Sequence, residues 1–312
     1  MTDNANVTTG NVETADLPRH STATTASLFH TFPAVQVDMA ALSDMGRVRT
    51  NNEDHFYAGR WGRFMEVAAT NLPEGELPKR AEEVGYVLLV ADGMGGEEGG
   101  EVASRLAIRT FIKQVMQLPE WFMRADSSGT EQPFVDRTVE RYQRVDATLR
   151  QHAERHQALS RMGTTMTMAY SVGADLFLAH IGDSRAYLLR DGQLKQLTRD
   201  QTLAQLLVDR GELTPEQAAS HRLRHVLTQV LGGQGEQLQV DIQQITLADD
   251  DWLLLCSDGL SDMVTDELLG KLIVDSKSAD AACQALIDKA LEQGGRDNVT
   301  AVLAHYRFPG AA

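Results

Sequence analysis

The feature that most constrains the fold is a series of short strand-forming runs that follow one another with only short turns between them. Three such runs, 164–172, 176–181 and 186–189, are rich in strand-forming residues, and Asp191-Gly192 gives a tight-hairpin signal after the third. Strands that adjoin in sequence across short turns pair in antiparallel fashion. The middle third of the chain is therefore expected to form antiparallel sheet.

Apolar residues recur at helical spacing in two separate groups rather than between successive strands. A doubly wound parallel sheet would need helices alternating regularly with strands. We therefore predict the α+β class, with two antiparallel sheets and helices outside them. The helical segments are 108–115, 135–149, 266–274 and 279–291, and the strands beside the last two are 252–256 and 299–306.

Several segments fall outside this pattern. Residues 1–33 are rich in Thr, Asn, Ala and Asp without apolar periodicity, so we expect a disordered N-terminal tail before a folded domain at 34–308, with a short C-terminal tail at 309–312. The stretch 60–83 indicates an inserted loop or a long hairpin tip. Residues 202–235 are polar and helical, and Thr214-Pro215 has the character of a helix start.

Composition excludes several classes of function. The 312 residues carry a net charge of −15, which argues against a nucleic-acid or anionic-membrane surface. The only cysteines, Cys256 and Cys283, support neither a disulfide framework nor a cysteine-based zinc site. No apolar run approaches the ~18 residues that span a bilayer, and no secretory signal is evident. We expect a cytoplasmic protein with no membrane or nucleic-acid partner.

Aspartate repeatedly follows an apolar, strand-like run. This is the case at Asp92, Asp183 and Asp258, and Asp297 immediately precedes the last predicted strand. Carboxylates at the rim of a core are unfavourable unless a cation neutralises them, and oxygen ligands without Cys or His indicate Mg²⁺, Mn²⁺ or Ca²⁺. Any single Asp-Gly pair would be a plain polar turn about four times in five. The case for a metal site rests on the whole set.

Six motifs surround these aspartates in a fixed order. They read GRVRTNNED at 46–54, ADGMGG at 91–96, MGTT at 162–165, GDSRAY at 182–187, SDGLSD at 257–262 and GRDN at 295–298. This series resembles the metal-dependent protein phosphatases of the PPM (type 2C) family, in its bacterial branch. The resemblance covers nearly the whole chain after the tail. It implies a four-layer α-β-β-α sandwich, with 202–235 as a small helical flap beside a two-metal centre.

The resemblance also implies a role for individual residues. Asp92 would bridge two Mn²⁺ or Mg²⁺ ions, and Arg49 would clamp the substrate phosphate with its planar charged group. Two ions that share a water lower its pKa, so the water could attack phosphorus without a covalent phosphoenzyme. The remaining ligands would be Glu53, Asp54 and the Gly93 carbonyl for one ion, and Asp258 and Asp297 for the other.

A third, weaker metal site is expected near Asp183, which could equally be a hydrogen-bonding corner. Many relatives have a further aspartate close to the position of Ser160, and its absence here puts that site in doubt. Met94 stands where eukaryotic members have a histidine that donates a proton. The flap histidines, His221 and His225, are expected to be surface or capping residues.

The resulting hypothesis is a protein serine/threonine phosphatase that opposes a cytosolic Ser/Thr kinase. Its expected partners are phosphorylated proteins, among them such a kinase, and the chain is expected to be a monomer. Two alternatives stay open. One is a protein that binds phosphorylated partners without turnover, and the other is a small-molecule phosphatase, which would need a deep pocket. The complete set of predicted metal ligands favours the enzyme.

Overall fold

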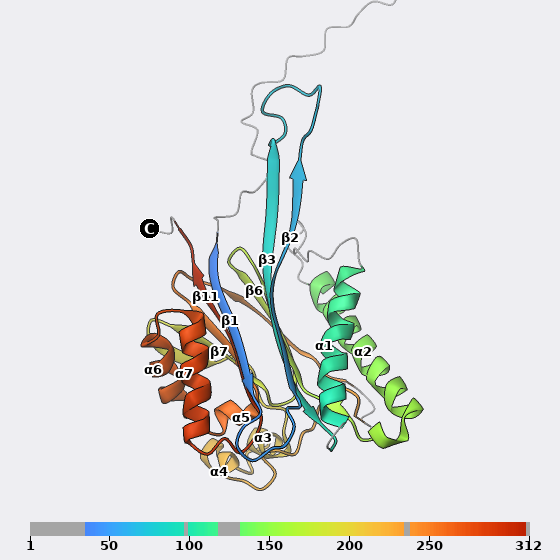
Figure 1. Cartoon of the computed structure of the whole chain (residues 1–312), viewed down its shortest axis with the longest axis vertical. Helices are drawn as coiled ribbons and strands as arrows, with labels where there is room; N and C mark the ends of the chain where they lie inside the picture. Colours follow the sequence, from blue (N-terminus) through green and yellow to red (C-terminus); the bar gives the residue numbers. More distant parts are fainter. Residues whose placement is uncertain (1–34, 97–98, 118–131, 234–237, 310–312) are drawn as a thin grey trace, which may run out of the picture. The chain divides into compact units, whose positions relative to one another are not determined.

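Two antiparallel sheets form the centre of the fold, as Figure 1 shows. The structure, a computed structural model, describes residues 35–96, 99–117, 132–233 and 238–309. The predicted N-terminal tail, 1–33, and residues 310–312 lie outside the described residues. One sheet has the strand order β1 (Gln36–Asp44), β11 (Val299–Arg307), β10 (Trp252–Cys256), β7 (Arg185–Arg190) and β8 (Gln193–Gln196). The other has the order β2 (Asp54–Glu66), β3 (Arg80–Met94), β5 (Met166–Val172), β6 (Asp175–Ile181) and β9 (Asp241–Thr246), with β4 (Gly163–Thr164) beside β3.

Helices cover the outer face of each sheet (Figure 1). The six-stranded sheet carries α1 (Gly99–Met116) and α2 (Gln132–Arg155), and a 3-10 turn, Gln157–Leu159, follows α2. The five-stranded sheet carries α5 (Asp258–Ser261), α6 (Asp266–Val274) and α7 (Ala279–Glu292). Among the described helices, none combines the length and the apolar character that a membrane crossing requires.

Strand periodicity explains the four layers. Leu88 and Val90 of β3 pack between the two sheets, whereas the alternate residue Leu89 packs under α1 and α2. In β10, Leu255 likewise faces the space between the sheets and Leu254 faces α6 and α7. Each of these strands is apolar on both faces because both faces are covered. The predicted four-layer α+β sandwich is confirmed.

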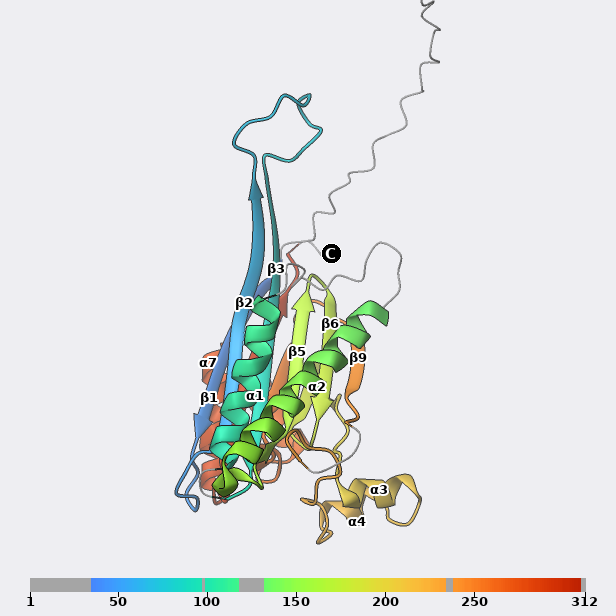
Figure 2. The same cartoon turned by 90° about the vertical axis from the view of Figure 1, so that its right-hand side faces the viewer.

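The segment 60–83 contains a hairpin tip, as predicted, but both of its ends belong to strands. β2 and β3 pair along their full length, and only 67–79 forms the tip of the hairpin. Figures 1 and 2 both show this hairpin extending past the ends of the neighbouring strands. Arg60 pairs with Glu82 and Arg63 with Glu83, each at 2.7 Å, across strands that have little apolar surface to bury. The prediction of a hairpin tip is therefore confirmed for 67–79, whereas the polar sequence at 60–66 and 80–83 did not reveal that these residues are strand.

Two short helices, α3 (Leu203–Asp209) and α4 (Pro215–Ala219), form the predicted flap. They lie at the end of the sheets opposite the hairpin tip (Figure 2). Thr214 and Gln217 form a reciprocal capping box ahead of Pro215, which confirms the predicted helix start. The backbone N–H of Gln201 donates to the Gly182 carbonyl at 2.8 Å, so the flap begins directly beside one of the predicted site loops.

Candidate metal centre

The ends of strands from both sheets surround a cavity of about 650 Å³. Six of the seven predicted site residues line it, together with Asp183. They are Arg49, Glu53, Asp92, Gly93, Asp258 and Asp297. The seventh, Asp54, lies buried behind Asp92, its partner across the β2–β3 pairing. Residues that are remote in the chain are thus brought to one place.

Asp92 lies at the centre of this charge. Burial raises its pKa well above the ordinary value for aspartate. Four further carboxylates raise it in addition, those of Asp54, Asp258, Asp183 and Asp297. Five acids that influence one another in this way repel strongly unless a cation lies among them.

The Met-Gly-Thr-Thr motif fixes the backbone of Asp92. Thr164 donates its hydroxyl to the Asp92 carbonyl at 2.8 Å, and the Asp92 N–H donates to the Thr165 hydroxyl at 3.0 Å. Thr165 in turn shares a 2.7 Å hydrogen bond with Ser184. Hydrogen bonds therefore hold both the N–H and the carbonyl of Asp92, and its side chain projects from this fixed backbone.

Asp54 shows that the pocket fits a cation. Its Oδ2 accepts hydrogen bonds from Ser257 at 2.6 Å and Thr300 at 2.7 Å, while its Oδ1 is buried and has no hydrogen-bond partner in the described part of the chain. Burial raises its pKa to about 7. A buried carboxylate oxygen without a donor, beside other carboxylates, suits a hard divalent ion that prefers oxygen ligands.

Glu53 is positioned by two neighbours that are remote in the chain. Its N–H donates to the Asn298 side chain at 2.8 Å, and its carbonyl accepts from Ser104 of α1 at 2.6 Å. Asn298 also donates to the carbonyls of Met45 and Asn51, at 2.9 and 2.8 Å. A single buried amide therefore holds the loop that carries Arg49 and Glu53 against the start of β11.

The glycines after the aspartates permit close packing rather than tight turns. A Cβ added at Gly93 would lie 2.1 Å from the Gly100 carbonyl oxygen, at the start of α1. One added at Gly259 would lie 2.0 Å from the Asn298 carbonyl oxygen. Both approaches are far shorter than a side chain tolerates. Glycine at these positions lets Asp92 and Asp258 come close to the loops that carry the other acids.

Arg49 lies at the exposed rim of the cavity. Its Nη2 pairs with Asp297 Oδ2 at 2.6 Å, and about half of its side chain remains exposed. The hydrogen bond that Arg49 donates to Asp297 raises the pKa of Arg49, against an opposing effect of burial. Its charge is permanent and can reach a ligand that enters the cavity.

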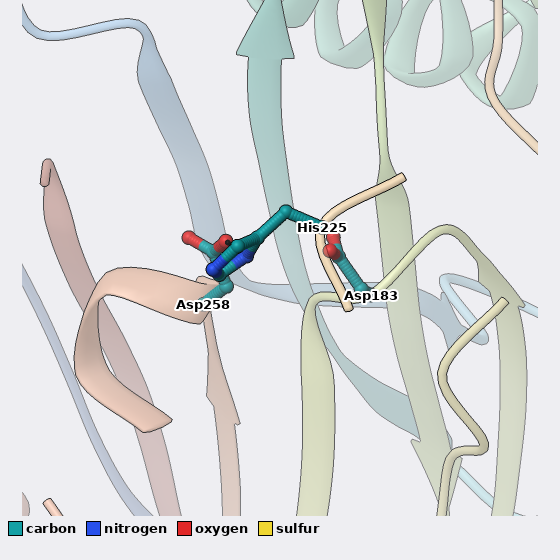
Figure 3. A group of neighbouring side chains, drawn as sticks. All are labelled: Asp183, His225 and Asp258. Atoms are coloured by element: carbon teal, nitrogen blue, oxygen red, sulfur yellow. Dashed lines mark ion pairs between the residues drawn. The ribbon is translucent and has the colours of Figure 1, made fainter. Parts of the chain in front are cut away.

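The flap brings a histidine into this centre. His225 Nδ1 lies 3.4 Å from Asp258 Oδ2, and its Nε2 lies 3.4 Å from Asp262 Oδ2. Figure 3 shows the ring of His225 beside Asp258, with Asp183 near it. One ligand atom from each of Asp183, His225 and Asp258 lies within 4.8 Å of the others. The hydrogen bond to Asp258 raises the pKa of His225.

His225 is exposed, as predicted, but the prediction gave it no place in the site. Asp183 is 8% exposed, and burial raises its pKa to about 8. Ser160 follows the 3-10 turn after α2 and does not line the cavity, whereas Met94 does and is 43% exposed. His221 is a local capping residue, since its Nδ1 accepts the Leu223 N–H at 3.3 Å. Only His225 of the two flap histidines meets the acids.

Cys256 is an inert core residue. It is fully buried in β10, and burial raises the pKa of its thiol to about 12. Cys283 is likewise buried and free. A thiol of this kind is not available as a thiolate nucleophile at neutral pH, in agreement with the prediction from its apolar surroundings.

Comparison with known proteins shows which family this chain resembles in sequence and in fold. A family profile described as Protein phosphatase 2C matches residues 79–303. The serine/threonine protein phosphatase PstP of Mycobacterium tuberculosis is 38% identical over 265 residues, which cover 85% of this chain and 44% of PstP. The serine/threonine phosphatase stp of Listeria monocytogenes is 32% identical over 84% of this chain and 92% of its own length. This chain thus spans less than half of PstP.

Solved structures give a matching result. A crystal structure of M. tuberculosis PstP covers 87% of this chain and 99% of its own, with 35% identity and a TM-score of 0.69. The catalytic domain of PstP, solved in complex with two manganese ions, covers 88% of this chain with 34% identity and a TM-score of 0.68. By sequence and by fold, this chain belongs to the protein phosphatase 2C (PPM) family.

Proposed function

We propose that this chain is a metal-dependent phosphatase that hydrolyses phosphoserine and phosphothreonine in other proteins. The observation that carries the proposal is the meeting of acids around one cavity, with the permanently charged Arg49 at its rim. These acids include Glu53, Asp92, Asp183, Asp258 and Asp297, and the buried Asp54 lies behind them. Family membership and the named activity of PstP and stp support it.

The acids divide into two groups around Asp92. We assign one ion to Asp92, Glu53, Asp54 and the Gly93 carbonyl, and the other to Asp92, Asp258 and Asp297. Two divalent ions, when bound, supply an acidified water and offset negative charge on the phosphoryl oxygens. All assigned side-chain ligands are oxygens, which suits Mn²⁺ or Mg²⁺. The PstP catalytic domain was solved with two manganese ions, which supports the number of sites.

Arg49 and the rim of the cavity would select the substrate. A planar guanidinium can hold two phosphate oxygens at once, and its half-exposed side chain can turn from Asp297 to an incoming phosphate. Met94 and His225, also exposed, leave room beside it for a protein chain. We therefore favour phosphoproteins over enclosed small molecules. Such substrates presuppose a Ser/Thr kinase, which we place with this chain in the cytoplasm because both cysteines are free and buried.

The activity itself has a direct test. With manganese, the purified chain should release phosphate from a phosphothreonine peptide and from a small aryl phosphate, because the proposed ligands all come from one chain and need no second copy. Phosphate release is measured colorimetrically, and size-exclusion chromatography should show a monomer. Tight binding of the phosphopeptide without any release would instead favour the phosphoprotein-binding alternative.

We further propose a third, weaker metal site formed by Asp183, His225 and Asp258. The buried Asp183 carboxylate and the imidazole replace the acid that is missing near Ser160. An imidazole ligand favours Mn²⁺ over Mg²⁺, because magnesium strongly prefers oxygen ligands.

His225→Ala should therefore reduce bound manganese from three ions to two, measured by equilibrium dialysis, with the number of magnesium ions unchanged. His221→Ala is the matched control and should keep the wild-type count. A wild-type protein that binds only two manganese ions at saturation would exclude the site.

A further inference from the structure

A second cavity, of about 640 Å³, lies between α1 and α2, away from the metal centre. Its floor includes Leu106, and its walls include Arg109 and Lys113 of α1 and Arg144 of α2. We call it the basic groove. It is notable in a chain with a net charge of −15, because α1 has three basic residues against one acid and α2 has five against four.

Two basic residues of the groove, Arg109 and Lys113, continue a row along α1 that begins at Arg105, outside the groove. Arg105, Arg109 and Lys113 follow at intervals of four residues and are all exposed, so they form one face of α1. Within the described residues, Arg109 and Lys113 have no carboxylate at ion-pair distance. Arg144 has one, Glu140 at 3.7 Å, but both side chains are more than half exposed, so this pair competes weakly with a ligand.

Two further observations show what the groove could accept. The pKa of His152, on α2, is lowered by burial and also by the charges of His156, Arg109 and Arg155, so Arg109 of α1 lies close enough to act on α2. Gln114 lines the groove, and its Oε1 is buried without a hydrogen-bond partner among the described residues. An acceptor of this kind suits a backbone N–H. Together these groups fit an acidic stretch of polypeptide.

The row is continuous with the metal centre. Asn51 lines the catalytic cavity and donates to Glu101 at 3.3 Å, and Glu101 pairs with Arg105 at 3.2 Å, one turn before Arg109. From the start of α1, beside Glu53, to Lys113 is roughly 20 Å at the helical rise of ~1.5 Å per residue. An extended peptide spans that distance in about six residues.

We propose that the basic groove binds an acidic segment of the phosphoprotein substrate, about six residues from the phosphorylated side chain. This inference rests on the proposed function and specifies its substrate class. The groove would raise the local concentration of acidic substrates at the centre without touching the reacting atoms.

The test compares phosphothreonine peptides that carry three glutamates, or three glutamines, about six residues before or after the phosphothreonine. At low salt the wild type should have about tenfold higher kcat/KM for one of the glutamate peptides, through a lower KM, and high salt should remove the difference. Arg109→Glu with Lys113→Glu should abolish the preference. Lys271→Glu with Lys277→Glu, which changes the net charge equally on the other helical layer, should retain it.

Small aryl phosphate serves as the internal reference, and its kcat/KM should be the same in all three proteins. Equal rates of the wild type on the glutamate and glutamine peptides, or equal loss in the control variant, would overturn the groove proposal. Failure to hydrolyse any phosphopeptide would refute the proposed function instead. The groove is then judged separately by fluorescence anisotropy of an unphosphorylated glutamate peptide, which should bind the wild type at least about fivefold more tightly than Arg109→Glu/Lys113→Glu.

Discussion

Replacing Asp92 by asparagine should reduce kcat for phosphate release by about a thousandfold or more, with the fold intact. The amide retains the size of the side chain. The hydrogen bonds that fix this position involve only the backbone of Asp92, whose carbonyl accepts from Thr164 and whose N–H donates to Thr165. What is lost is the charge that both proposed ions share. Steady-state kinetics with aryl phosphate in manganese measures the effect, and full activity in the variant would reject the assignment.

The same variant should be more stable than the wild type when metal is absent. Asp92 has a folded-state pKa above its unfolded value, so its negative charge destabilises the folded state at neutral pH, and asparagine removes this repulsion. We expect about 1–3 kcal/mol in the free energy of unfolding, measured with urea in chelator. Asp275→Asn, at an exposed carboxylate after α6, is the control and should be neutral. If Asp92→Asn lost metal-free stability as well as activity, the result would indicate misfolding instead.

Removal of divalent ions from the wild type should eliminate turnover and lower its stability. Each ion that binds only the folded state adds about 2.7 kcal/mol to the free energy of unfolding at a concentration one hundred times its dissociation constant. Thermal melts across a manganese titration should therefore show a rising Tm in the wild type. The Tm of Asp92→Asn should respond far less. Undiminished turnover in excess chelator would contradict the two-ion site. A Tm that does not change with manganese concentration would contradict it as well.

Much of the fold follows from the sequence because strong patterns coincide with buried elements. β10 is predicted to the residue, since its five apolar positions are covered on both faces and end at Ser257. α6 is likewise predicted at its observed bounds. In contrast, the outer part of the β2–β3 hairpin has no alternating apolar pattern. Backbone pairing and cross-strand ion pairs hold it together, and neither has a signature in hydropathy.

The candidate metal centre could likewise be predicted from the sequence only in part. The acids at strand ends could be found because they interrupt apolar runs, and six of the seven predicted residues line the cavity. His225 could not, because it occurs in a polar flap and meets Asp258 and Asp262 only through tertiary packing. The buried Asn298 was visible in the GRDN motif, but its three hydrogen bonds to a distant loop have no counterpart in sequence spacing.

Asp54 has one more consequence. It belongs to the six-stranded sheet, yet it accepts hydrogen bonds from Thr300 of β11, in the five-stranded sheet, and from Ser257, which directly follows β10 of that sheet. These hydrogen bonds therefore join the two sheets at the place where the acids meet. The proposed ligands of one ion, Glu53, Asp54, Asp92 and the Gly93 carbonyl, all lie on or directly before β2 and β3 of the six-stranded sheet. The other proposed ion also needs Asp258 and Asp297, which lie beside β10 and β11 of the five-stranded sheet. On this assignment, only the second ion requires the two sheets to be packed together, so its binding would report on their docking.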